Sequence, residues 1–409
     1  MPEIAATDAT GKSPDQADPA GVVSQVRALL EAHYVFPDIA EAVSGVLAEG
    51  LAAGRYPPDA AELAAVVTAD LQSANGDKHL RLQYHDEALP VRAPGDDAGQ
   101  VTSLAKWADR VCGGVACVQR LAGNVGYLDL QPILFPAAIC GEIITAAMSL
   151  VARTDALILD LRHCGGGEPG MAVFVASYLW DGDPVQLTGL RERQDFTPRQ
   201  MWTLPHVPGR RFGKTKPVYL LTSAATFSGG EQLAYDLQQL GRTAVVGERT
   251  RGGAHPREAF PVHAHLQATI PVAESVNPVT GGNWEGTGVT PDVEVSASQA
   301  RDTAYRLALQ AVMAAGTLGR RGQQRTRVNI ARRERYRSPS ACCLSRTQQA
   351  RAPRNSDSSP PHRRSEGGSA VPAISGIGER AGSQDTGGYS EELVAWHPGE
   401  SGALADYVL

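Results

Sequence analysis

Two buried strands in this chain each lead through a few small residues directly into a helix, and this repeated arrangement restricts the fold more than any other feature. The first strand is the apolar run 156–161, which stops at Gly165, Gly166 and Gly167. The second covers residues 217–221 and continues into the segment 222–231, rich in small residues. Continuous apolar runs of this length are typical of strands buried on both faces of a parallel sheet. The sequence therefore predicts an α/β layered core.

Hydrophobic periodicity extends this pattern along the chain. Apolar positions between Val22 and Leu51 suit amphipathic helices that are interrupted near Pro37, and a further helix fits residues 59–71. Residues 79–84 alternate as a strand does, and residues 86–104 resemble a polar loop. Further strands are expected at 125–130, 243–247 and 268–272, and further helices at 140–153, 171–180, 228–240 and 300–315.

These patterns divide the chain into five regions. Residues 1–20 are expected to be disordered, 21–85 to form an N-terminal helical domain, and 86–122 to form a linker region. Residues 123–315 are expected to form the α/β core. Residues 316–409 form an Arg-rich tail that we expect to be mostly disordered, because it lacks hydrophobic periodicity. An unstructured extension is the simpler interpretation of this tail, and binding to nucleic acid or another acidic partner is the alternative.

Composition disfavours several classes of function for the body of the chain. Residues 1–315 carry 24 Lys and Arg against 35 Asp and Glu, which argues against nucleic-acid binding outside the tail. No run approaches the ~18 apolar residues of a membrane span, and we expect no signal peptide. Six cysteines in 409 residues do not suggest a disulfide framework. We therefore expect a cytoplasmic protein without a membrane segment, and the sequence leaves its oligomeric state open, a homo-oligomer included.

Ser228 is the strongest candidate for a nucleophile. It lies where a helix is expected to begin, followed by Gly229 and Gly230, which let a substrate approach the backbone closely. The first N–H groups of a helix can stabilise an oxyanion, and the turn at 165–167 offers a second set of N–H groups. The alternatives are that Ser228 is only an N-cap residue and that the glycines form only a tight turn.

Three segments together resemble the tail-specific, or C-terminal processing, serine peptidase family. They are DLRHCGGG at 160–167, SAATFSGGE at 223–231 and GNWEGTGVTPD at 282–292. The match is best to the branch that contains the interphotoreceptor retinoid-binding protein repeats and the tricorn protease core, and it covers roughly residues 20–315. The resemblance implies a ClpP/crotonase-like spiral core with an N-terminal helical domain. Many members insert a PDZ domain before the core, but the stretch 84–123 is too short for one.

The resemblance also implies which residue takes the proton from the serine. In the better-known members a lysine does so, but Gly253 occupies its position and no lysine follows Lys216. Arg251 cannot replace it, because a guanidinium stays protonated in proteins. The tricorn-like branch instead uses a histidine and a glutamate, and the resemblance assigns these roles to His79 and Glu285.

Several alternatives to this assignment stay open. His79 is also explained as a surface histidine at the start of a strand, and Glu285 as a loop carboxylate. The rival bases are His255, the best of them, then His163 and His263. The rival acids are Glu231 and Glu248. Cys164 stands where the family usually has asparagine, which makes the geometry of the oxyanion hole less certain.

The sequence therefore predicts a serine-type peptidase that acts on peptides or proteins through an acyl-enzyme on Ser228. Gly229, Gly165, Gly166 and Gly167 are the candidate oxyanion or substrate-binding residues. No cofactor or metal is expected, since no Cys/His cluster has the spacing of a metal site. With a histidine base, activity should rise with pH around ~6 to ~7.5. A non-catalytic carrier of an apolar ligand on the same fold is the alternative function.

Overall fold

A six-stranded sheet forms the centre of the molecule. The computed structural model describes residues 16–89, 97–193 and 197–316. The strand order is β12-β8-β7-β4-β3-β2. In chain order these strands are β2 (Val115–Leu121), β3 (Val125–Leu130), β4 (Ala156–Asp160), β7 (Val218–Thr222), β8 (Ala244–Gly247) and β12 (Val293–Glu294). All neighbours pair in parallel except the edge strand β2, which is antiparallel to β3. The predicted α/β fold is confirmed.

Helices cover both faces of this sheet, as the continuous apolar strands require. On one face lie α5 (Ala137–Val151), α6 (Pro169–Ser177) and α7 (Ser228–Gln239), and on the other lies α8 (Ala297–Ala314). Successive strand residues point to opposite faces. In β4, Leu157 and Leu159 therefore join the cluster with α5, α6 and α7, while Ile158 packs with α8.

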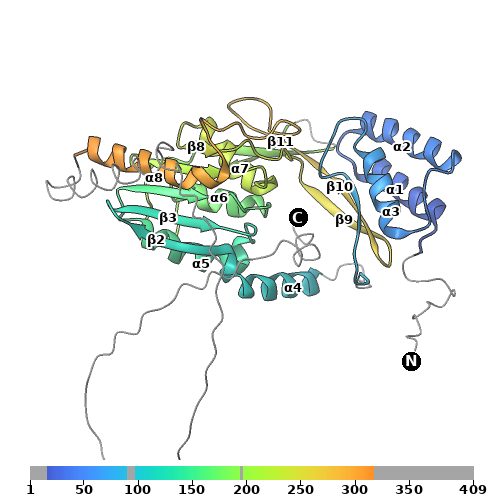
Figure 1. Cartoon of the computed structure of the whole chain (residues 1–409), viewed down its shortest axis with the longest axis horizontal. Coiled ribbons are helices and arrows are strands. Elements are labelled where there is room, and N and C mark those ends of the chain that lie inside the picture. Colours follow the sequence, from blue (N-terminus) through green and yellow to red (C-terminus); the bar gives the residue numbers. More distant parts are fainter. Residues whose placement is uncertain (1–15, 90–96, 194–196, 317–409) are drawn as a thin grey trace, which may run out of the picture.

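The N-terminal helices form a second layered unit with a small sheet. They are α1 (Pro19–His33), α2 (Pro37–Ala52) and α3 (Ala60–Leu71), and the sheet has the order β1-β10-β9, made of β1 (Arg81–Tyr84), β9 (Arg257–His263) and β10 (Leu266–Pro271). In Figure 1 this unit lies at the end of the molecule away from α8. Its hydrophobic cluster includes Leu266, Ala268 and Ile270, so the hairpin β9–β10 packs with the N-terminal helices although it lies within the predicted 123–315 core.

Local signals explain where these helices begin. Asp18 accepts hydrogen bonds from the backbone N–H groups of Ala20 and Gly21, and Asp59 accepts one from Glu62. Carboxylates in this position satisfy N–H groups that a helix leaves free. Residues 19 and 20, expected within a disordered N-terminus, instead belong to α1, which begins at Pro19. Residues 1–15 and 317–409, for which we predicted disorder, lie outside the described residues.

The polar loop predicted over residues 86–104 is wrong from residue 97 onward. Helix α4 (Asp97–Arg110) occupies this stretch, followed by the 3-10 turn η1 (Cys112–Gly114) and the edge strand β2. The helix has a polar composition because only a narrow stripe meets the core, formed by Leu104, Trp107, Ala108 and, just after it, Val111. Val101, in the same helix, is exposed. A short stripe on a polar helix gives a weak periodic signal.

A third sheet, of order β11-β5-β6, completes the described part of the chain. It is antiparallel and consists of β5 (Gln186–Glu192), β6 (Arg199–Trp202) and β11 (Ala273–Val276). None of the helices in the described ranges combines the length and apolar character that a membrane span needs.

Candidate active site

Ser228 is the first residue of α7 and has a strained backbone. Its φ is 47°, in the left-handed region that residues other than glycine rarely adopt. Phe227, not Ser228, is the N-cap, and its side chain makes no capping hydrogen bond. The Ser228 hydroxyl is half-buried and has no hydrogen-bond partner among the residues that the structure describes. A strained serine with a free hydroxyl at a helix start is typical of a nucleophile.

The buried carboxylate of Glu231 holds this strained start of α7 in place. It accepts hydrogen bonds from the backbone N–H groups of Ser228, Gly252 and Gly253 and from the Thr250 hydroxyl. Burial raises the pKa of Glu231 to about 7, although these four donors act in the opposite direction. Glu231, named in the sequence as a rival acid, therefore has a structural role that ties the nucleophile to the loop 250–253.

The predicted glycine turn packs directly against the nucleophile. A Cβ atom built on Gly166 would lie 3.2 Å from the Ser228 Cβ, and one on Gly229 would lie 2.5 Å from the Gly167 carbonyl oxygen. Gly166 and Gly167 have φ values of 140° and 127°, which favour glycine. The Gly165 N–H already donates to the Pro132 carbonyl oxygen at 2.8 Å. The free N–H groups near Ser228 therefore belong to Gly166, Gly167 and Gly229 rather than Gly165.

Cys164 supports this turn from a fully buried position. Burial raises the pKa of its thiol to about 12. Its Sγ lies 3.4 Å from the Gly166 carbonyl oxygen as a weak donor, and its own carbonyl oxygen accepts the Phe227 N–H. A Cβ on Gly230 would lie only 3.0 Å from the Cys164 Sγ. Cys164, which stands where the resembled family usually has asparagine, therefore packs closely against Gly230.

His79 reaches the nucleophile region through Phe227. Its ring stacks on the Phe227 ring with a centroid distance of 4.6 Å, and Phe227 directly precedes Ser228. The His79 side chain is buried and its Nδ1 has no hydrogen-bond partner. Burial lowers the pKa of His79 to about 3, although the nearby charge of Asp77 acts in the opposite direction. The imidazole is therefore neutral at physiological pH, the form that can accept a proton.

Gly253, at the position where the better-known members of the resembled family carry lysine, has no room for any side chain. A Cβ there would overlap the Phe227 ring and lie 2.8 Å from the His79 Cε1. The two stacked rings thus occupy the volume that a side chain at 253 would need.

We expect Gly253→Ala to lower kcat/KM by roughly 100-fold, because the added methyl group displaces the His79 and Phe227 rings. The overpacking should also cost about 1–3 kcal/mol of unfolding free energy. The matched control is Gly282→Ala, since nothing lies within 4 Å of a Cβ at Gly282. Peptide hydrolysis and thermal melting of both variants check the prediction. An unchanged kcat/KM for Gly253→Ala would contradict this packing.

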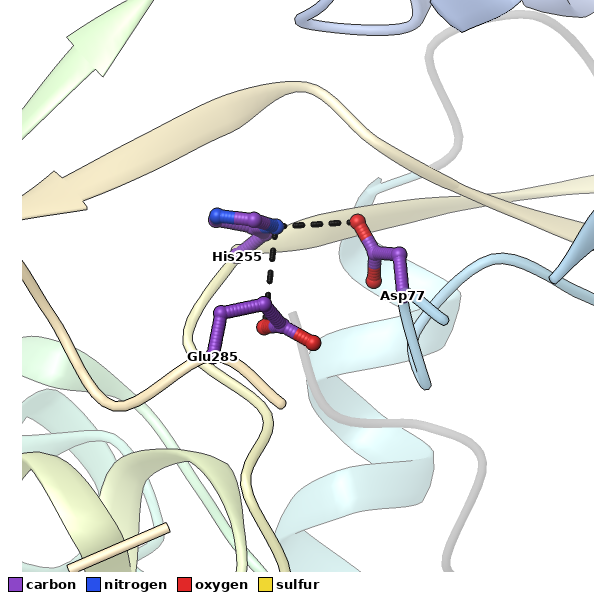
Figure 2. A group of neighbouring side chains, drawn as sticks. All are labelled: Asp77, His255 and Glu285. Carbon is purple, nitrogen blue, oxygen red and sulfur yellow. Dashed lines mark hydrogen bonds and ion pairs between the residues drawn. The ribbon is translucent and has the colours of Figure 1, made fainter. Parts of the chain in front are cut away.

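A second histidine, His255, lies between two carboxylates. Figure 2 shows its Nδ1 facing Asp77 and Glu285, at 2.9 Å from Asp77 Oδ2 and 3.5 Å from Glu285 Oε2. Burial favours the neutral ring, but the hydrogen bond and charge of Asp77 outweigh it and raise the pKa of His255. Burial would raise the pKa of Asp77, but the hydrogen bond and charge of His255 outweigh it and lower that pKa. Asp77 thus favours the protonated form of His255.

Asp77 links this second histidine to the first. Its Oδ1 accepts the backbone N–H of His79, while its Oδ2 accepts hydrogen bonds from His255 and from the Tyr34 hydroxyl. The side chain is fully buried. Asp77 is not among the candidates from the sequence, because Asn75, Gly76 and Asp77 together are typical of a turn. The signal in the sequence that could have identified Asp77 was its position two residues before His79.

Glu285 contacts His255 rather than His79. Its Oε2 also accepts the Ala254 N–H, and its Oε1 is buried without a partner. Burial, followed by the charge of Asp77, raises the pKa of Glu285. The structure therefore brings Ser228 together with Gly166, Gly167 and Gly229. It connects His79 to Ser228 through Phe227, and it connects Glu285 to His79 through His255 and Asp77.

The same three residues offer a geometry that could hold a metal ion. One ligand atom from each of Asp77, His255 and Glu285 lies within 4.8 Å of the others. The spacing of residues in the sequence does not predict this group, because its members lie far apart along the chain. The hydrogen bond between His255 and Asp77 accounts for the arrangement without an ion.

Comparisons with known proteins match two parts of this chain to one family. The model of peptidase family S41 matches residues 124–295, and that of the N-terminal domain of peptidase S41 in eukaryotic IRBP matches residues 16–109. A solved protein from Parabacteroides merdae, titled as a peptidase, is 17% identical, with a TM-score of 0.50 over 72% of this chain and 97% of its own. This likeness supports the fold.

Two further solved structures match at lower similarity. A photosystem II D1 C-terminal processing protease is 15% identical, covers 69% of this chain and 94% of its own, and has a TM-score of 0.42. The tricorn protease is 16% identical, covers 52% of this chain and 19% of its own, and has a TM-score of 0.33.

Proposed function

This chain belongs to peptidase family S41, and from that premise we propose that it is a serine-type peptidase with Ser228 as nucleophile. The observation that carries the proposal is the left-handed backbone of Ser228, placed against the Gly166 turn with a free hydroxyl. Such strain costs about 1–3 kcal/mol and persists where function requires it. A carrier of an apolar ligand has no use for this strain, so the geometry favours the enzyme.

In the proposed reaction, the Ser228 Oγ attacks the peptide carbonyl while His79 takes its proton. The N–H groups of Gly229, Gly166 and Gly167 stabilise the oxyanion of the tetrahedral intermediate. The protonated His79 then gives its proton to the leaving amine, and an acyl-enzyme remains on Ser228. Water, activated by His79, releases the acid product and restores the enzyme.

Glu285 supports this base indirectly in the proposal. It pairs with His255, which holds Asp77, and Asp77 in turn binds the His79 backbone N–H. This differs from a triad in which the acid contacts the base. His255 is a poorer candidate for the base, because Asp77 stabilises its protonated form.

Several finer features belong to the same proposal. The core is of the ClpP/crotonase type and carries no PDZ domain, since only residues 85–114 separate β1 from β2. The substrates are peptides or proteins, and the cytoplasm is the proposed location. These points rest on sequence length, composition and resemblance.

Labelling with a fluorophosphonate tests the proposal. The probe phosphonylates activated serines, so we expect one modified residue, Ser228, when the labelled protein is digested and its peptides are identified by mass spectrometry. A protein that stays unmodified while a known serine hydrolase in the same tube reacts would contradict the proposed function.

The pH profile distinguishes the two candidate bases. If His79 is the base, kcat/KM should rise with pH through a midpoint below the free histidine value of ~6.5, because burial lowers the pKa of His79. If His255 is the base, the midpoint should lie above ~6.5, because Asp77 raises its pKa. The sequence alone supports only the range of ~6 to ~7.5, because it does not show how far burial lowers the pKa of the base or how far Glu285 raises it.

A further inference from the structure

Two cationic side chains beside the nucleophile have no acidic partner among the residues that the structure describes. The guanidinium of Arg251 lies over the Phe227 ring, 4.6 Å from its centroid, and Arg251 is exposed. The Lys78 ammonium donates to the backbone carbonyl oxygen of Arg251. Elsewhere in the core, Arg162 is paired with Asp160 at 2.6 Å. Within the described part of the chain, neither Arg251 nor Lys78 therefore forms an ion pair with a carboxylate.

Backbone contacts place Arg251 within a few residues of the attacking hydroxyl. Its N–H donates to the Thr226 carbonyl oxygen at 3.1 Å, two residues before Ser228. The next two residues, Gly252 and Gly253, bind the same Glu231 carboxylate that holds the Ser228 N–H. The position of Arg251 relative to the nucleophile is therefore set by rigid, buried hydrogen bonds.

Stacking on Phe227 orients the guanidinium without occupying its donors. An aromatic face attracts the cation, but it does not engage the N–H groups that lie in the plane of the guanidinium. A guanidinium placed over a ring in this way keeps its fork of N–H donors free for a carboxylate, which it can bind through two parallel hydrogen bonds. The arrangement is thus prepared for an anionic group that the chain itself does not supply.

The buried carboxylates of the site are already engaged with other groups. Asp77 and Glu285 share His255, and Glu231 accepts four internal hydrogen bonds. All three are largely shielded from solvent, whereas Arg251 faces solvent. The positive charge beside Ser228 therefore remains available to a bound substrate.

We propose that Arg251, assisted by Lys78, binds a carboxylate of the peptide substrate close to the scissile bond. This inference rests on the proposed function and specifies its substrate class as acidic. An extended peptide rises ~3.4 Å per residue. Because an arginine side chain has a limited reach, the bound carboxylate should lie within roughly two residues of the attacked carbonyl. An Asp or Glu side chain and a free C-terminus both provide this group.

Binding to the Ser228→Ala protein tests the inference without turnover. Fluorescent peptides are compared in matched pairs: one Glu or Gln at successive positions of an otherwise neutral peptide, and the same neutral peptide with a free or amidated C-terminus. We expect one pair to differ about tenfold in Kd in favour of the carboxylate. The Glu/Gln pairs identify a side-chain carboxylate, and the acid/amide pair identifies a C-terminus.

Arg251→Gln, added to Ser228→Ala, should abolish most of this preference while leaving the Kd of the neutral peptide within about twofold. Lys78→Gln should have a smaller effect in the same direction. The matched control is Arg249→Gln, a cation two residues away whose guanidinium donates to the Thr287 carbonyl oxygen. It should leave the preference unchanged.

Equal affinities for the acidic and neutral members of every pair would overturn the inference, and so would a preference that survives Arg251→Gln. Neither result would affect the proposed function, which stands or fails on fluorophosphonate labelling of the wild-type protein. A third outcome is that the wild-type protein stays unlabelled but still prefers acidic peptides through Arg251. This result would support the binding site and contradict the proposed peptidase activity.

Discussion

Replacing Ser228 by alanine should lower kcat by a factor on the order of 10⁴ to 10⁶, because the attacking hydroxyl is lost and nothing in the site replaces it. Fluorophosphonate labelling should disappear together with activity. The fold should persist, since the Ser228 N–H, which binds Glu231, is unaffected. Peptide hydrolysis, labelling and circular dichroism measure the three effects. The matched control is Ser298→Ala, whose exposed hydroxyl contacts only Ser296.

Ser228→Gly adds a second readout to this prediction. Glycine adopts a φ of 47° without steric cost, so this variant should be inactive yet about 1 kcal/mol or more stable towards unfolding than Ser228→Ala. Chemical denaturation compares the two variants. Residual activity well above background in Ser228→Ala would exclude Ser228 as the nucleophile. A Ser228→Gly protein less stable than Ser228→Ala would contradict the strain at this position.

His79→Ala should lower kcat by a factor on the order of 10⁴, because no other neutral base stacks beside the nucleophile. His255→Ala should lower it less, by roughly 100-fold at most, through displacement of Asp77 and hence of His79. The loss of stability should have the opposite order, so that His255→Ala destabilises the protein more than His79→Ala does. Removing the His255 ring leaves the buried Asp77 and Glu285 side chains without their shared partner and should cost about 3–5 kcal/mol.

The two variants are compared by single-turnover kinetics and urea denaturation. His255→Gln, which keeps a hydrogen-bond donor near Asp77, should recover part of the activity lost in His255→Ala. No such recovery is expected for His79→Gln, because an amide is not a base. A His255→Ala protein that loses more activity than His79→Ala would move the role of base to His255.

The strand–turn–helix units at Gly165–Gly167 and Ser228 were visible in the sequence because their signal is local. Apolar runs identify the buried strands, and small residues identify the turns wherever the strands lie in space. The same holds for α3, which begins after Asp59 as predicted. In contrast, α4 was missed, because most of its residues face away from the core and its apolar stripe is short.

The partners of the candidate base could not be predicted in the same way. Asp77 and His255 are 178 residues apart, and nothing in either local segment indicates that they meet. The hairpin β9–β10 brings them together, because it packs on the N-terminal helices and carries the loop before it to that unit. The resemblance identified Glu285 as the supporting acid, but only the structure shows that it contacts His255 and not His79.

By itself, the sequence determined the layered α/β core, the lack of any lysine after Lys216, and Ser228 as the candidate nucleophile. Each of these depends on residue types and short-range spacing. Only the tertiary structure decided the left-handed conformation of Ser228, the burial that keeps His79 neutral, and the pairing of Asp77 with His255. These properties depend on which groups shield one another from water. Long-range packing, rather than local spacing, determines which groups those are.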